Sequence, residues 1–253
     1  MKKLLFALVG LSMLTFGAAN AQYKMTIHKT DNTTVEIDLN DISEVTFDQT
    51  EVAFEYEAVD LGLESGTLWA SCNVGAQKPE DYGYYIAWGE TAPHEEGVAY
   101  TEDDYSDYYF DMMPSTIAGT EYDAAKAIMG EGWTMPTNAQ AIELAFTCTV
   151  TWEEVNGVFG ARFVGPNGNS IFIPAAGRKQ ESAVANEVGT NGFVWIDAMF
   201  RSNPEGAYIM WFGESPENGS VMIAAGDGSD KEHPLIAAPR VTGLSVRGVK
   251  TVK

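Results

Sequence analysis

The residues whose chemistry could support catalysis are few and far apart. The three histidines, His28, His94 and His233, are scattered along the chain, and no two of them have the His-x-x-x-His spacing of a zinc site. Catalytic triads assemble from distant residues, so a hydrolase stays open as an alternative. No local pattern favours one, and we predict that the protein is not an enzyme.

Acidic residues form two groups with enough oxygen atoms to bind calcium. Residues 91–116 interleave carboxylates with aromatic side chains, and Asp227 and Asp230 flank a short Gly-Ser turn. The fixed ligand spacing of an EF-hand loop is absent from both groups. We therefore predict a solvated acidic loop and a polar turn, with calcium as the alternative, and we expect no other metal or cofactor.

The N-terminus predicts export. Residues 1–21 combine a basic start, an apolar run and a small-x-small cleavage motif that ends at Ala21, which is typical of a secretory signal peptide. The apolar run is shorter than the roughly 20 residues of a membrane span, and no cysteine follows it to carry a lipid anchor. We expect a periplasmic, secreted or cell-surface protein that has no membrane span and is not lipid-anchored.

Two cysteines, Cys72 and Cys148, remain in this exported chain. An even number of cysteines in an oxidising compartment usually indicates a disulfide, and with two cysteines the connectivity is forced. Closing a loop of about 75 residues would stabilise the fold by about 4 kcal/mol in the chain-entropy model. We predict a disulfide between Cys72 and Cys148, with a reactive thiol or a metal ligand as the alternative.

The net charge argues against two classes of partner. The formal charge is −21 at pH 7, and such an acidic chain repels phosphate backbones and anionic lipid surfaces. We expect no nucleic-acid partner. High acidity also keeps an exported protein soluble, which explains the charge without any ligand.

The remaining residues divide into a small unit and a large one. Apolar residues alternate on both sides of Asp31-Asn32, which predicts a β-hairpin unit over residues 22–50, followed by a linker at 51–58. Helix formers and capping residues predict helices over 122–129 and 137–146. Asn-Gly turns and short apolar runs predict strands after Cys148. Two helices among several short antiparallel strands indicate the α+β class.

A series of short motifs runs through residues 59–249. The motifs are Val59-Asp-Leu-Gly-Leu63, Ser65-Gly-Thr-Leu-Trp69, Cys72-Asn-Val-Gly-Ala76, Pro79-Glu-Asp-Tyr-Gly83, Ala87-Trp-Gly-Glu90, Tyr122-Asp-Ala-Ala125, Trp133-Thr-Met-Pro-Thr137, Gly165-Pro-Asn-Gly-Asn-Ser-Ile171, Pro174-Ala-Ala-Gly177 and Gly243-Leu-Ser-Val-Arg247. In order and spacing, the series resembles the secreted C-type-lectin-like domains of gut Bacteroidetes, including the Fibrobacter succinogenes major paralogous domain. The resemblance implies a C-type-lectin-like domain over residues 59–253.

The same fold is used by formylglycine-generating enzymes, and the segment from Trp133 to Leu144 resembles one of their helix starts. Those enzymes depend on a cysteine pair late in the domain. Here no cysteine follows Cys148, so the resemblance does not carry their activity to this chain, because a fold alone does not confer function.

In related lectin-like domains, ligands contact the loops ahead of the closing strand, which implies a binding surface within residues 195–239 here. The family's Trp-Ser-Ser segment is replaced by Trp195-Ile-Asp197, so the ligand preference does not transfer. The candidate ligand-binding residues are Trp195, Asp197, Arg201, Asn203, Trp211, Glu214, Asp227 and Asp230. Because Trp195 and Trp211 lie in strand patterns, burial is favoured over ligand stacking for these two residues.

Two functions from different classes follow. In the first, the protein is a non-catalytic binding module whose C-terminal loops contact a glycan or protein at the cell envelope. In the second, it is a structural or assembly component of the envelope or of a surface appendage, and its N-terminal hairpin pairs with a partner by strand addition. An enzyme of unknown type is a third possibility.

Overall fold

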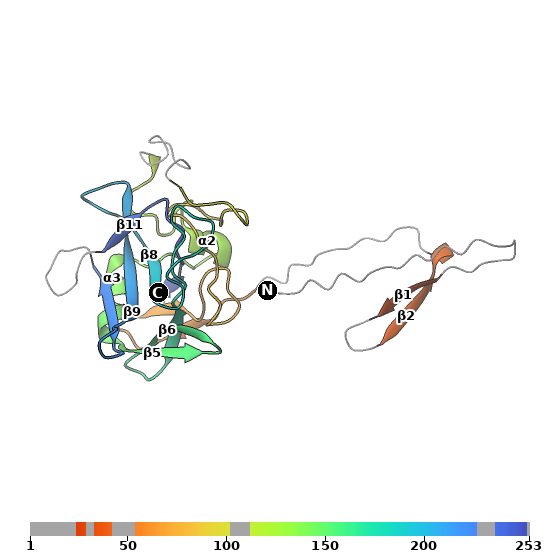
Figure 1. The fold of residues 1–253 in the computed structure, drawn as a ribbon, viewed down its shortest axis with the longest axis horizontal. Helices are drawn as coiled ribbons and strands as arrows, with labels where there is room; N and C mark the ends of the chain where they lie inside the picture. The colour runs from red at the N-terminus through yellow and green to blue at the C-terminus, as the bar shows by residue number, and fades with distance from the viewer. Residues whose placement is uncertain (1–23, 29–32, 42–53, 102–111, 227–235, 252–253) are drawn as a thin grey trace, which may run out of the picture. The chain divides into compact units, whose positions relative to one another are not determined.

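The structure is a computed structural model that describes residues 24–28, 33–41, 54–101, 112–226 and 236–251. Two compact units, Met1–Val52 and Ala53–Lys253, divide the chain (Figure 1). The predicted signal peptide, residues 1–21, lies outside the described residues. So do Asp227 and Asp230, and with them the predicted polar turn. Among the described residues, no helix has both the length and the apolar character needed to cross a membrane.

The N-terminal unit contains a two-stranded hairpin. Strand β1 (Lys24–His28) pairs antiparallel with β2 (Thr34–Asp38), and a 3-10 turn, η1 (Leu39–Asp41), follows. Met25, Val35 and Ile37 are half-buried, whereas Lys24 and Glu36 are exposed. The alternation therefore gives the hairpin one apolar face, as period-2 patterning predicts.

Two helices of the large unit begin at capping residues. Helix α2 (Ala124–Met129) starts after Asp123, whose carboxylate accepts a hydrogen bond from the Lys126 amide. Helix α3 (Asn138–Thr147) starts after Thr137, which forms a capping box with Gln140. These caps satisfy amides that the first helical turn leaves unpaired. Both helices lie where the sequence predicts them.

The described residues of the large unit form three antiparallel sheets. The first has the order β12-β4-β3, with β3 at Ala58–Asp60, β4 at Thr67–Ala70 and β12 at Val249–Thr251. The second has the order β5-β6-β7, with β5 at Thr149–Val155, β6 at Val158–Val164 and β7 at Ser170–Pro174. Asn156 and Gly157 both have positive φ, as a two-residue hairpin turn requires.

The third sheet is centred on β9 (Gly206–Glu214). Strand β8 (Asn191–Met199) pairs along one edge of β9, and β10 (Val221–Ala225) and β11 (Ala237–Pro239) pair with different parts of it. The β8–β9 register shifts between Trp195 and Met199. The large unit is thus a mixed, sheet-rich α+β structure (Figure 1).

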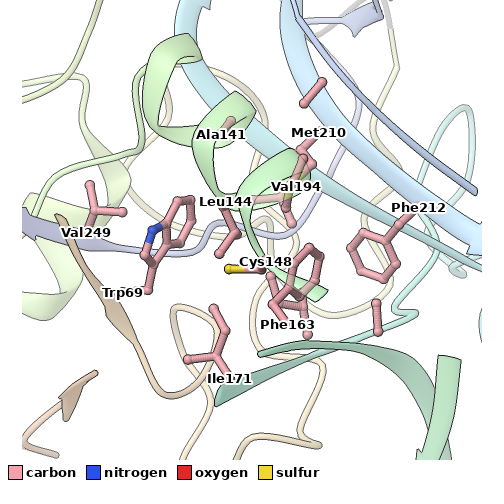
Figure 2. Packing of buried hydrophobic residues seen from close by; sticks show 14 of the residues in the cluster. Trp69, Ala141, Leu144, Cys148, Phe163, Ile171, Val194, Met210, Phe212 and Val249 are labelled. Atoms are coloured by element: carbon pink, nitrogen blue, oxygen red, sulfur yellow. The ribbon is translucent and has the colours of Figure 1, made fainter. Parts of the chain in front are cut away.

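The main apolar core lies between α3 and the sheets. Figure 2 shows Leu144 of α3 above Cys148, with Trp69 of β4 on one side and Phe163 of β6 on the other. Phe163 meets Phe212 edge to face, with ring centroids 6.0 Å apart. A second cluster surrounds Trp88 and Trp195, and a small third one surrounds Tyr56 and Trp133. Burial of these large aromatic side chains supplies much of the driving force for folding.

The predicted disulfide between Cys72 and Cys148 is wrong in this structure, because both residues are buried free thiols. Cys148 belongs to the main core with Trp69, whereas Cys72 packs in the third cluster beside Tyr56. The two side chains are therefore anchored in different parts of the interior. Each one fills a small apolar space, which is a common role for an unpaired cysteine.

Candidate functional site

The candidate residues of the C-terminal third occupy very different environments. Trp195 is fully buried on β8, and its indole N–H donates to the Ile86 carbonyl (2.8 Å). Asp197 is also buried, at the irregular part of β8. Trp211 is half-buried on β9 and donates to the Asn191 side chain (2.9 Å). These three side chains are part of the packed interior or its border.

The remaining described candidates lie at opposite ends of β9. Arg201 and Asn203 lie in the turn before the strand, and Glu214 is its last residue. A strand of this length spans about 26 Å at 3.3 Å per residue. The structure therefore does not gather these residues into one surface, and Asp227 and Asp230 lie outside the described residues.

Two buried carboxylates, Asp123 at the start of α2 and Asp197 on β8, lie near each other. Asp123 accepts hydrogen bonds from the amides of Gly119 (2.7 Å), Lys126 (3.1 Å) and Met135 (3.1 Å). Burial raises the pKa of Asp123, and these amides oppose the rise. Burial and the charge of Asp123 raise the pKa of Asp197 to about 6. Asp123 is fully engaged by backbone donors, so its role is to tie three segments together.

His94 lines a hollow of about 470 Å³ together with Glu90, Glu121 and Tyr122. Its Nδ1 lies 3.2 Å from the Ala99 carbonyl oxygen, and its Nε2 lies 3.2 Å from a Glu90 carboxylate oxygen. Both ring nitrogens therefore face oxygen acceptors inside the protein. Because both nitrogens are already taken by protein oxygens, His94 does not have the geometry of a general base that acts on a ligand in the hollow.

A second hollow, which we call the edge groove, lies between two of the sheets and has a volume of about 480 Å³. Residues 58–60 of β3 and 170–172 of β7 line it. Each of these strands is an edge strand of its own sheet. The walls of the edge groove are therefore strand edges, where backbone N–H and C=O groups can accept a new partner.

One end of the edge groove is closed by the β6–β7 turn. The side-chain amides of Asn167 (2.9 Å) and Asn169 (2.8 Å) both donate to the Asp60 carbonyl oxygen. The turn lies so close to the chain that a Cβ on Gly165 would come within 2.0 Å of the Leu61 carbonyl oxygen. Two side chains thus occupy the place that a neighbouring strand would take beside Asp60.

A buried arginine joins the two sheets. The Arg247 guanidinium donates to the Ala70 carbonyl of β4 (2.8 Å), the Phe172 carbonyl of β7 (2.9 Å) and the Asn73 side chain (2.9 Å). Burial lowers the pKa of Arg247 to about 10, so it remains charged at neutral pH. Because its acceptors are neutral oxygens, it holds the sheets together by charge-assisted hydrogen bonds.

The rim of the edge groove carries unbalanced negative charge. Glu57 and Asp60 are exposed on the β3 side. On the β7 side, Arg162 is paired with Glu153 (2.6 Å) and donates to the Ser170 hydroxyl (3.2 Å). The one arginine that lines the groove is thus already neutralised, and the carboxylates of Glu57 and Asp60 set the sign of the local field.

None of the six described candidates from the C-terminal third lines the edge groove. The sequence holds one signal for it, the amide-rich turn Asn167-Gly-Asn169, since side-chain amides can complete a neighbouring strand edge. Among the described residues, no group of three His, Cys, Asp or Glu side chains could hold a metal ion. Comparisons with protein-family models, curated proteins and solved structures found no match to this chain.

Proposed function

We propose that this protein is an exported, non-catalytic binding module with a C-type-lectin-like domain, which contacts a glycan or protein at the cell envelope through the edge groove. The observation that supports the proposal is a groove of about 480 Å³ with strand edges on both walls and carboxylates on its rim. Small-ligand sites commonly have volumes of about 300–1,000 Å³. The proposed surface thus differs from the C-terminal loops that the sequence favours.

The arrangement of the titratable residues supports binding rather than catalysis. The nitrogens of His94 face internal acceptors, and Asp123 accepts bonds from backbone amides. A general acid or base must have an atom within reach of its substrate. The polar groups along the edge groove can instead recognise a ligand without reacting with it.

A glycan array and a peptide array would test the proposal with three proteins. The first is the unmodified protein, and the second is Ser71→Trp, which places an indole at a groove-lining position. The third is Val184→Trp, which adds the same side chain at a residue that is 75% exposed and does not line the groove. We expect Ser71→Trp to lose a signal that Val184→Trp retains. Equal signals from both variants would contradict the proposal.

A second candidate function, envelope assembly, is favoured by the N-terminal hairpin. Met25, Val35 and Ile37 form one half-buried face of a sheet with two strands. Such a hairpin is marginally stable without additional packing. Deleting residues 22–50 should abolish complex formation and leave array binding intact if the hairpin is an assembly element. Retention of the complex after the deletion would contradict this second function.

A further inference from the structure

We infer that the edge groove binds an extended, basic peptide segment as an added β-strand. The inference rests on the proposed binding function and specifies its ligand class. It depends on which backbone groups of β3 and β7 point into the groove. Strand addition uses such groups for affinity, and side chains along the strand provide specificity.

The hydrogen bonds of β3 show which of its groups face outward. The Ser71 amide donates to the Glu57 carbonyl (2.9 Å), which makes the pair at 57 and 71 a hydrogen-bonded one. The next pair, Ala58 and Ala70, is then non-hydrogen-bonded, because the two kinds alternate in antiparallel sheets. Consistently, the Ala70 amide donates away from β3, to the Gly248 carbonyl (2.9 Å). The backbone groups of Ala58 and Asp60 therefore point towards the groove.

The same reasoning applies to β7. The Ala175 amide donates to the Phe159 carbonyl and the Gly165 amide donates to the Asn169 carbonyl, both at 2.8 Å. With the observed register, Ser170 and Phe172 fall at non-hydrogen-bonded pairs with β6. Their backbone groups therefore point away from β6, and the Phe172 carbonyl is the one that accepts from Arg247.

Each wall thus presents a backbone donor and acceptor to the groove. On β3 these are the groups of Ala58, because the side chains of Asn167 and Asn169 occupy the place beside Asp60. On β7 they are the groups of Ser170, because Phe172 is buried and its carbonyl accepts from Arg247. In a peptide strand placed between the two walls, successive residues would direct their N–H and C=O groups to opposite walls.

The lining of the edge groove favours a peptide over a glycan. Its aromatic residue, Phe172, is 2% exposed, so it has no open ring face on which a sugar could stack. The exposed carboxylates of Glu57 and Asp60 favour a segment that carries lysine or arginine. Because these charges are exposed, salt should weaken the interaction.

The probe is a synthetic peptide of about seven alternating threonine and lysine residues, the length of an ordinary strand. Its binding to the full protein would be measured by fluorescence anisotropy at low and high salt. Two isomers, N-methylated at odd or at even positions, each remove the donors that face one wall. We expect each isomer to bind about tenfold or more weakly than the parent peptide, and a glutamate-for-lysine peptide not to bind.

A matched pair of protein variants tests the β3 wall directly. Ala58→Pro removes one amide that points into the groove and no bond to β4, because proline is tolerated at the open side of an edge strand. Ala58→Val keeps the amide and serves as the control. We expect Ala58→Pro to weaken binding of the parent peptide about tenfold, with Ala58→Val close to the unmodified protein.

Several outcomes would overturn the inference, and the N-methylated peptides keep it testable even if Ala58→Pro does not fold. Equal binding of the parent peptide and both isomers would exclude strand addition, and weakening of one isomer alone would exclude pairing on both walls. A groove-dependent glycan signal without peptide binding would overturn this inference and leave the proposed function standing. Equal signals from Ser71→Trp and Val184→Trp in every array would overturn both this inference and the proposed function.

Discussion

The two edges of the β12-β4-β3 sheet are treated in opposite ways. At the β12 edge, Thr134 and Val249 exchange two backbone hydrogen bonds of 3.0 and 2.8 Å. At the β3 edge, the side chains of Asn167 and Asn169 cap one carbonyl, and the rest faces the edge groove. Open strand edges invite unwanted pairing, so proteins normally cover them. The contrast supports our proposal that the β3 edge pairs with a partner.

A third edge, at β8, resembles the covered one. The Trp195 amide donates to the Ser245 carbonyl (3.0 Å), and the Asp197 amide donates to the Pro136 carbonyl (2.9 Å). The Met199 amide then donates to the Ser115 carbonyl (2.8 Å). Irregular segments thus complete this edge with backbone groups. The β12 and β8 edges are thus covered by backbone groups, whereas the β3 and β7 edges line the groove.

The largest expected effect comes from removing the link between the sheets that flank the groove. Arg247→Met would leave the carbonyls of Ala70 and Phe172 and the side chain of Asn73 without their buried donor. We expect the free energy of unfolding to fall by about 3–5 kcal/mol, because breaking a buried charged network leaves its partners unsatisfied. Urea denaturation would measure the loss.

The control for Arg247→Met is Arg162→Met at the groove rim. Arg162 pairs with Glu153 while about a third of its side chain is exposed, and pairs of this kind contribute about 0–1 kcal/mol. A loss at Arg247 no greater than the loss at Arg162 would show that the sheets are held together by other contacts.

The next effect concerns the free-energy cost of burying the Asp197 carboxylate at the covered β8 edge. Asp197 is buried there, and its folded-state pKa of about 6 exceeds the ordinary value near 3.8. Well below pH 3.8 the carboxyl is protonated in both the folded and the unfolded state, so it has no effect on stability. Above pH 6 the folded state holds a buried charge, which costs about 3 kcal/mol. We expect Asp197→Asn to raise the free energy of unfolding by up to that amount at pH 8 and by less than about 1 kcal/mol at pH 4.

Thermal unfolding at several pH values would measure the effect of Asp197→Asn. Glu214→Gln, at an exposed position, serves as the control and should change little at any pH. An equal gain at pH 4 and pH 8 would show that packing, rather than ionisation, explains the change at Asp197.

A smaller effect is expected where side chains cap the β3 edge. Asn167→Ala and Asn169→Ala each remove one donor to the Asp60 carbonyl and leave the other in place. We expect each to lower the free energy of unfolding by less than about 1 kcal/mol, and the double variant to lower it by more than the sum, since the carbonyl then loses both donors. Additive losses in urea denaturation would show that the two amides act independently.

The sequence predicts the local elements of this fold better than the site. Asp123 and Thr137 have the chemistry of helix caps, and Asn156-Gly157 has the chemistry of a tight turn, so these elements follow from nearby residues. The edge groove joins strands about 110 residues apart, and its walls depend on register. Local patterns do not fix that register, and residues 51–58, which include the first residue of β3, look like a linker because acidic residues dominate there.

The candidate residues of the C-terminal third show the same limit. Trp195 and Trp211 follow strand patterns, which favour burial, and Trp195 is buried while Trp211 is half-buried. The burial of Asp197 could not be predicted, because it results from the β8 register shift and from cover by residues near Ser115 and Pro136. A tertiary contact of this kind leaves no periodic signal in the sequence.

The smallest expected effect concerns the two thiols. Cys72 follows β4 and Cys148 precedes β5, so a disulfide between them would tie together the two sheets that flank the groove. Both thiols are free and buried. Burial raises the pKa of Cys72, and burial together with the Glu143 charge raises the pKa of Cys148 to about 11. Both are therefore protonated and unreactive at neutral pH.

We expect a reducing agent to leave the Tm of the protein unchanged, because there is no covalent link to break. Iodoacetamide should label neither Cys72 nor Cys148 in the native protein and should label both in denaturant without prior reduction, as mass spectrometry would show. A disulfide would instead stabilise the fold by about 4 kcal/mol. A fall of several degrees in Tm on reduction, with labelling that requires reductant, would mean that a covalent link joins the sheets and that Arg247 does not hold them alone.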